Sequence, residues 1–597
     1  MRNIRNQPRK RSFESLENRQ LLAGNVTADA TTVPGTLVIV GDNSANVLVL
    51  TQVSPGVIKI TPAGTKLNGS SSAQKFTVTN GIYIDMGGGS DSLTLKSLTV
   101  PGIDETYSAG LAILMGTGND ALVMSQVTVA DGYCAIDTGD GSDATAIDRN
   151  NFNHSFYIDG GNGNNAIAIS RSRIDGQFVI LTGSGNDAIT LLNDNVNLDD
   201  PVLAAVTLPV DPATEIDNVA AVVGNDFQDL AESLADDGSY IDTGAGADAV
   251  ALNGVNISGL TEIYTDAGND AVAIVNSTFG DPAITTIDVA TVTPDTPSIG
   301  TTDFSGLCIE TDGGSDAVSI VNTTVYGFLQ VDTSGGVDCP TEELCSCIDG
   351  GVRTQQTEPS GTDGNDAVVL NNVKVLVSAE AETSSECCQS IETWCENNPN
   401  VIPNEISWEC CICECLTEES ILESGTLLIY TGNQVDAVAL NKVTTDAQAD
   451  IYTTDETSLD GADAVAITNS SFNVNNEVMQ CTTLPFVSTG DGLYIETGCG
   501  NDAVTIAKVN VVGEAEIQTG AGSDHVAITA LVADSIYAEL DGGNYDTLAI
   551  TNSSASEANF YDDGGSWGTL VRAHNNFGNP SSPPTNTPGN GFQYVVG

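Results

Sequence analysis

An acidic residue recurs in a glycine-rich motif, Gly-x-Gly-[Asn/Ser]-Asp-Ala-[Val/Ile/Leu], as in Gly183-Ser-Gly-Asn-Asp187-Ala-Ile189. Carboxylates are hard oxygen donors that suit Ca²⁺, and they repel one another when stacked closely unless cations or backbone donors neutralise them. An Asp in a glycine turn can also accept backbone N–H bonds without a metal. The motif therefore predicts a cation site or a hydrogen-bonded turn at the aligned positions Asp91, Asp120, Asp143, Asn165, Asp187, Asp248, Asp270, Asp316, Asp366, Asp436, Asp463, Asp502, Asp524 and Asp546.

The spacing between copies of the motif indicates the elements that position these side chains. The recurring spacing is 22 residues, and the longer spacings fit the same unit interrupted by insertions. Apolar residues alternate after the acidic position, as with Val250 and Leu252, which indicates a strand with one buried face. Val255 and Ile257 repeat this pattern, and a third apolar position, such as Ile241, precedes each glycine turn. Three short strands per unit and no crossover helix predict an all-β fold, a right-handed parallel β-helix (β-solenoid) with about 22 residues per coil.

Glycine and asparagine recur at the expected corners of the coils. Glycine provides the positive φ or the close approach that a Cβ atom would block. Asparagine side chains can hydrogen-bond between neighbouring corners and stack as a ladder. The recurring asparagines are Asn193, Asn253, Asn276, Asn322, Asn371, Asn441, Asn469 and Asn552.

The repeated motif resembles the calcium-binding nonapeptide of RTX β-rolls, Gly-Gly-x-Gly-x-Asp-x-aliphatic-x. The match is partial, because the leading glycine is generally absent and the copies occur once per coil rather than in tandem. The resemblance implies Ca²⁺ held between stacked turns by carboxylate and carbonyl oxygens. The candidate ligands are Asp187, Asp248, Asp270, Asp502 and Asp524. The alternative, a turn closed by backbone N–H bonds, needs no metal.

The repeats divide the chain into four parts. We predict a basic N-terminal segment at 1–23, an N-terminal β cap at 24–80, the β-solenoid at 81–577 and a Pro-rich C-terminal arm at 578–597. The solenoid carries insertions near 198–238, 280–307, 337–362 and 376–424, where a binding face is usually built. The arm ends in Phe592, Tyr594, Val595 and Val596, which we expect to pair with another subunit, since the end of a solenoid is an unpaired sheet edge.

The chain has 14 cysteines, and most lie in two insertions. An even number of cysteines in an exported chain predicts disulfides that stabilise polar loops, with zinc as the rival interpretation. The disulfide candidates are Cys339, Cys345, Cys347, Cys387, Cys388, Cys395, Cys410, Cys411, Cys413 and Cys415. The others, in or near the coils, are expected to be buried thiols: Cys134, Cys308, Cys481 and Cys499.

The first residues are basic, unlike the rest of the chain, and lack the apolar core of a secretory signal. The string Phe13-Glu-Ser-Leu-Glu-Asn18-Arg-Gln-Leu-Leu-Ala23 resembles the LEPR-XLL N-terminal segment of planctomycete cell-surface proteins, with Asn18 in place of the usual Pro. The resemblance implies that residues 1–23 are an export segment removed near Ala23, and that the protein is extracellular or at the cell surface.

Composition and charge exclude several functions. The net charge of −62 repels nucleic acid, and no stretch approaches the roughly 20 apolar residues of a membrane span. A polysaccharide hydrolase of the polygalacturonase type combines a catalytic Asp pair with Gly-His-Gly and Arg-x-Lys motifs. The chain contains Asp pairs but neither of these motifs. The basic cluster Arg149, Arg171 and Arg173 with His154 suits a carbohydrate contact or a solvated ion pair with nearby Asp.

These observations favour a non-enzymatic role. We expect an extracellular structural protein, a self-associating subunit of a fibre, sheath or adhesin, stabilised by Ca²⁺ and disulfides. Its expected partner is itself, with a surface polysaccharide as a second candidate. The alternative is a polysaccharide-binding or polysaccharide-cleaving β-helix, which predicts a groove lined by carboxylates, Arg and aromatic residues.

Overall fold

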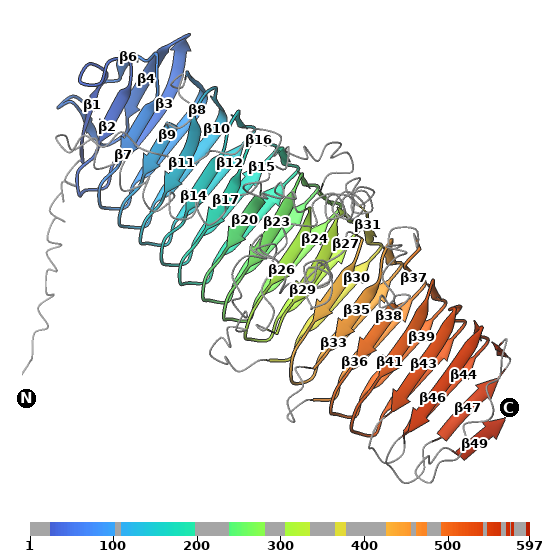
Figure 1. Ribbon diagram of the computed structural model, residues 1–597. Coiled ribbons are helices and arrows are strands. Elements are labelled where there is room, and N and C mark those ends of the chain that lie inside the picture. Colours follow the sequence, from blue (N-terminus) through green and yellow to red (C-terminus); the bar gives the residue numbers. More distant parts are fainter. Residues whose placement is uncertain are drawn as a thin grey trace, which may run out of the picture.

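The computed structural model describes residues 24–101, 109–197, 238–280, 305–334, 364–377, 425–454, 461–474, 491–540, 546–562, 569–573, 575–577 and 593–596. These residues form a rod of stacked coils that runs from the N-terminal cap to the C-terminal end (Figure 1). The described residues form strands and no helix, and every strand pairing after the cap is parallel. The predicted parallel β-solenoid is confirmed.

The first face of the rod consists of strands that, in most coils, begin directly after the recurring Asp. Its strands are β8 (Ser92–Val100), β10 (Ala121–Val129), β12 (Ala144–Asp148), β15 (Ala166–Ser170), β18 (Ala188–Leu192), β21 (Ala249–Asn253), β24 (Ala271–Val275), β27 (Ala317–Val321), β30 (Ala367–Asn371), β33 (Ala437–Asn441), β36 (Ala464–Thr468), β39 (Ala503–Ala507), β42 (His525–Thr529), β44 (Thr547–Thr551), β47 (Thr569–Ala573) and β49 (Gln593–Val596).

The second face consists of short strands beyond the next corner. They are the ends of β8 and β10 together with β13 (Asn151–Phe152), β16 (Arg173–Asp175), β19 (Asn195–Asn197), β22 (Asn256–Ile257), β25 (Thr278–Phe279), β28 (Thr324–Tyr326), β31 (Lys374–Leu376), β34 (Thr444–Thr445), β37 (Ser471–Phe472), β40 (Asn510–Val511), β45 (Ser554–Ala555) and β48 (Asn576–Phe577).

The third face leads into the next glycine turn. Its strands are β7 (Ile82–Asp85), β9 (Ala109–Leu114), β11 (Tyr133–Asp137), β14 (Phe156–Asp159), β17 (Phe178–Leu181), β20 (Gly238–Asp242), β23 (Leu260–Tyr264), β26 (Gly306–Glu310), β29 (Phe328–Asp332), β32 (Leu427–Tyr430), β35 (Ala449–Tyr452), β38 (Asp491–Glu496), β41 (Glu514–Gln518), β43 (Ser535–Leu540) and β46 (Glu557–Asp562).

The cap closes the N-terminal end of the rod with the antiparallel pairs of the described chain. Its strands are β1 (Asn25–Asp29), β2 (Leu37–Val40), β3 (Val47–Ser54), β4 (Val57–Pro62), β5 (Lys66–Leu67) and β6 (Gln74–Thr77). Strand β3 pairs in parallel with β8, while β4 pairs antiparallel with both β3 and β6. The cap therefore turns the edge of the first face into a hairpin.

The register between coils keeps the 22-residue unit across insertions. Ala166 pairs with Ala188, 22 residues later, and Ala188 pairs with Ala249, 61 residues later. The predicted insertions lie largely outside the described residues. Inward-facing side chains such as Leu252 and Ile263 are at most 1 % exposed and belong to one core along the rod.

Glycine at the turn is required by the distance between coils. A Cβ atom added to Gly246 would lie 1.4 Å from the carbonyl oxygen of Gly185, and one added to Gly522 would lie 1.4 Å from that of Gly500. Successive turns are therefore stacked backbone on backbone, as the sequence predicted.

At the corner between the first and second faces, the residue six positions after each recurring Asp has a left-handed backbone conformation, with φ of 49–66°. Glycine and asparagine tolerate this conformation best. The residues at this corner are Ser97, Gln126, Arg149, Arg171, Asn193, Gly254, Asn276, Asn322, Asn372, Lys442, Asn469, Lys508, Ala530 and Asn552.

Ala530 occupies this corner at φ 57°. We expect Ala530→Gly to raise the free energy of unfolding by about 0.5–1 kcal/mol, because an L-residue pays a steric cost in this region that glycine does not. The control Ala527→Gly, at an exposed position of β42, should lower it by a similar amount, since glycine weakens a strand. Urea unfolding measures both variants, and a loss of stability in Ala530→Gly would contradict the expectation.

Candidate functional site

The recurring Asp side chains face the interior and join each coil to the preceding one. The backbone N–H of Asp248 donates to Oδ1 of Asp270 at 2.7 Å, and the N–H of Asp187 donates to Oδ1 of Asp248 at 2.6 Å. Each member is at most 4 % exposed. We call this column the aspartate ladder, and its bonds of 2.5–3.1 Å link in turn Asn46, Asp91, Asp120, Asp143, Asn165, Asp187, Asp248, Asp270, Asp316, Asp366, Asp436, Asp463, Asp502, Asp524 and Asp546.

The ladder supplies an acceptor where the corner interrupts main-chain pairing. The C=O of Asp248 accepts a main-chain bond from the N–H of Ala271 at 3.0 Å, but the N–H of Asp248 bonds to a carboxylate instead. A buried N–H left without an acceptor costs about 1–3 kcal/mol. Each ladder side chain therefore stabilises the stacking of two coils.

Threonine hydroxyls hold the second carboxylate oxygen in several coils. Thr243 donates to Oδ2 of Asp248 at 3.2 Å, and Thr519 donates to Oδ2 of Asp524 at 3.0 Å. Both hydroxyls come from five residues before the Asp. The sequence analysis missed this threonine, although Thr-Gly recurs ahead of the motif, as at Thr497.

Asn46 is a ladder member that the motif search did not find. Its N–H donates to Oδ1 of Asp91 at 2.6 Å, so the cap joins the ladder directly. Ser44 stands where the motif has glycine, which hid the position. The alternating Leu48 and Leu50 that follow it are the signal that could have found it.

Burial raises the pKa of the ladder carboxyls. Desolvation is the largest cause, and the neighbouring ladder carboxylates of Asp366 and Asp270 add to it at Asp316. The backbone N–H bond opposes the shift in each case, because it favours the ionised form. The raised pKa is about 8 for Asp316, about 7 for Asp91 and Asp502, and about 6 for Asp143, Asp248, Asp270, Asp366 and Asp524.

The ladder carboxylates bind backbone N–H groups, as the metal-free alternative predicts. Ca²⁺ takes about six to eight oxygen ligands, whereas one oxygen of each candidate ligand already accepts a backbone N–H. These ligands are Asp187, Asp248, Asp270, Asp502 and Asp524. The described residues contain no group of three or more His, Cys, Asp or Glu side chains that could hold a metal ion. The geometry matches the metal-free alternative, and Ca²⁺ binding elsewhere in the chain stays a prediction.

The predicted asparagine ladder is present on the outer corner. The side-chain amide of Asn372 donates to Asn322 at 3.0 Å, and that of Asn322 donates to Asn276 at 3.2 Å. Asn441 continues the pattern by donating to Asn371 at 2.9 Å. These bonds join coils on the outside as the aspartate ladder joins them on the inside.

The basic cluster forms surface ion pairs. The guanidinium groups of Arg149 and Arg171 both contact Asp148, and Arg173 contacts Asp175 at 2.7 Å. The three Arg side chains are more than half exposed. These exposed ion pairs match the solvated alternative of the sequence analysis.

The described cysteines differ from one another. Cys134 is a buried thiol, as predicted, and burial raises its pKa. Cys308 was expected to be a thiol but is disulfide-bonded. The ten disulfide candidates of the insertions lie outside the described residues.

Tyrosines line the outer side of the third face. The rings of Tyr430 and Tyr452 stack with centroids 4.9 Å apart, and those of Tyr452 and Tyr494 lie 5.4 Å apart. The hydroxyl of Tyr494 donates to Glu496 at 2.9 Å. The sequence analysis did not identify this row, in which Tyr430 and Tyr452 stack face to face and Tyr494 is tilted against Tyr452.

The C-terminal strand β49 pairs in parallel with β47 of the same chain, with Tyr594 opposite Leu570 and Val595 opposite Val571. Val596 lies opposite Arg572, whereas Phe592 is outside the described residues. The described part of the predicted arm, 593–596, therefore adds a strand to the first face of its own chain, and its pairing with another subunit stays a prediction.

Comparisons with protein-family models, curated proteins and solved structures found no match to this chain. In the described part of the chain, no helix is long and apolar enough to cross a membrane.

The ladder needs an acceptor rather than a charge, as Asn165 shows by accepting the N–H of Asp143 at 3.1 Å. We expect Asp502→Asn to change the free energy of unfolding at pH 7 by less than about 1 kcal/mol, because it keeps the acceptor for Asp463. Asp502→Ala should lower it by about 1–3 kcal/mol. Urea unfolding compares the two, and equal losses would show that the ladder depends on the charge.

The raised pKa values predict that stability falls as pH rises. Above about pH 5 the unfolded carboxyls are ionised, while the folded chain still holds protons on residues such as Asp316. Unfolding then releases protons, so the melting temperature should fall from about pH 5 to about pH 8. Asp316→Asn should flatten this slope, and the exposed control Asp140→Asn should leave it unchanged. A melting temperature that rises over this range would contradict the expectation.

Proposed function

We propose that the protein is an extracellular structural subunit, a rigid β-solenoid that self-associates into a cell-surface fibre, sheath or adhesin. The observation that carries this proposal is the unbroken aspartate ladder, which connects the described coils from Asn46 in the cap to Asp546 near the C-terminal end. Stacked backbone bonds, a continuous apolar core and two side-chain ladders resist bending and pulling apart of the coils. A rod of this kind has a mechanical use without a catalytic one.

The two ends of the rod support assembly in one direction. The N-terminal end is closed by the antiparallel strands of the cap. At the C-terminal end, β46 pairs with β43, β48 with β45, and β49 with β47, and their other edges meet no described strand. Unpaired edges template pairing with another chain. We propose that this end, including Tyr594, Val595 and Val596 of β49, joins subunits.

The disulfide at Cys308 supports the extracellular location. Disulfides persist in oxidising compartments and are rare in the cytosol. The net charge of −62 keeps such rods soluble and away from polyanions. Export through the N-terminal segment and stabilisation by the cysteine-rich insertions belong to the same proposal.

Sedimentation velocity and negative-stain electron microscopy of the full chain test the proposal. We expect filaments or defined oligomers that Val595→Asp reduces strongly, because a charge on an edge strand disfavours its pairing with another chain. The matched control Val435→Asp alters an exposed valine, 52 % accessible, away from both ends and should assemble normally. Chelation with EDTA should leave the assemblies intact, since the ladder uses backbone donors.

Isolated rods at every protein concentration would overturn the self-association proposal. Equal loss of assembly in both valine variants would show that the C-terminal end is not the joining surface. Assemblies that dissolve in EDTA would restore Ca²⁺ as a structural ion.

A further inference from the structure

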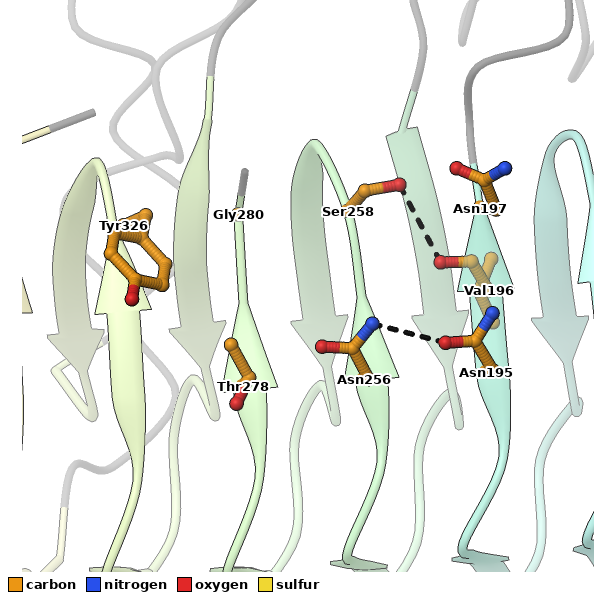
Figure 2. Close-up of a pocket in the computed structure, with 8 residues that line it drawn as sticks. All are labelled: Asn195, Val196, Asn197, Asn256, Ser258, Thr278, Gly280 and Tyr326. Carbon is orange, nitrogen blue, oxygen red and sulfur yellow. Dashed lines mark hydrogen bonds between the residues drawn. The ribbon is translucent and has the colours of Figure 1, made fainter. Parts of the chain in front are cut away.

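A polar groove lies on the outer side of the second face, where β19, β22, β25 and β28 run side by side (Figure 2). Its cavity has a volume of about 330 Å³, within the about 300–1,000 Å³ of small-molecule sites. Four neighbouring strands at the usual spacing span about 14 Å along the rod. The lining residues are Asn195, Val196, Asn197, Asn256, Ser258, Thr278, Gly280 and Tyr326.

The described residues that line the groove are uncharged, and most carry side-chain donors and acceptors. The amide of Asn256 donates to the Oδ1 atom of Asn195 at 3.0 Å (Figure 2), which leaves an acceptor on Asn256 and a donor on Asn195. Figure 2 draws no hydrogen bond from the side chains of Asn197 and Thr278 to the other described residues that line the groove. The groove therefore combines the hydroxyl of Thr278, the amide donor of Asn195 and the amide acceptor of Asn256 on neighbouring strands.

Charged side chains on this face lie beyond both ends of the groove. On one side, Arg173 and Asp175 occupy the strand next to β19 and pair with each other at 2.7 Å. On the other side, Lys374 occupies the strand next to β28. An anionic ligand would find no counter-charge among the described lining residues and would also be repelled by the net charge of −62.

We infer that this groove binds an uncharged saccharide. Sugar hydroxyls both donate and accept hydrogen bonds, which matches paired amide and hydroxyl groups. Tyr326 at one end offers an aromatic ring for the C–H face of a sugar. The stacked tyrosines of the third face are less suited, because Tyr430 and Tyr452 cover each other's rings. The inference is independent of self-association.

Isothermal titration calorimetry of the full chain with cellohexaose, mannohexaose and xylohexaose tests the inference, with hexagalacturonate as the charged comparison. We expect at least one neutral hexasaccharide to bind and hexagalacturonate not to bind. Tyr326→Ala and Asn197→Ala should each weaken binding about fivefold to tenfold. The matched control Asn510→Ala removes an exposed amide from the same face in a distant coil, β40, and should bind normally.

Thermal melting confirms that each variant is folded before its affinity is compared. The inference is overturned if none of the three neutral hexasaccharides binds at millimolar concentration. It is also overturned if hexagalacturonate binds as well as they do, or if Asn510→Ala weakens binding as much as Tyr326→Ala. Because assembly is measured separately, failure of saccharide binding is distinct from failure of self-association.

Discussion

A backbone N–H at the corner after each glycine turn finds its acceptor on the side chain of the next coil, and the order of the rod depends on that bond. In a parallel sheet, the main-chain N–H and C=O groups of neighbouring strands hydrogen-bond to one another, but a corner between strands interrupts this pairing. Here the Oδ1 atom of Asp270 takes the place of a main-chain carbonyl for the N–H of Asp248. The bond fixes which residue stands above which, so the apolar rows and the outer asparagines follow in register.

The same constraint produces an unusual electrostatic interior. Carboxylates stacked in a buried column cannot all ionise without repulsion, and desolvation raises their pKa, to about 7 at Asp502. Threonine hydroxyls such as that of Thr497 offset part of this cost at the second oxygen. Asn165 performs the same task without a charge, which indicates that the acceptor and not the anion is what the coil requires.

Regularity inside the rod permits variation outside it. Ala367 and Ala437 pair in register although 70 residues separate them, so an insertion between coils leaves the ladder intact. The outer faces carry different chemistry at different heights: surface ion pairs at Arg171, a neutral polar groove beside Asn256, and stacked rings at Tyr452. The outer faces of one scaffold thus differ along its length, and at its C-terminal end the last strands pair with described strands on one side only.

The repeat in the sequence was sufficient to determine the fold, because the 22-residue spacing and the alternation at Val250 and Leu252 encode local strand and turn geometry. The asparagine ladder and the buried thiol of Cys134 also followed from local pattern. Whether the aspartates hold a cation or a backbone N–H was left open, since both interpretations use the same motif. Only the stacking of coils revealed the backbone N–H that each Oδ1 atom accepts. The groove beside Asn256 was equally beyond the sequence, because its walls come from coils brought together by the three-dimensional structure.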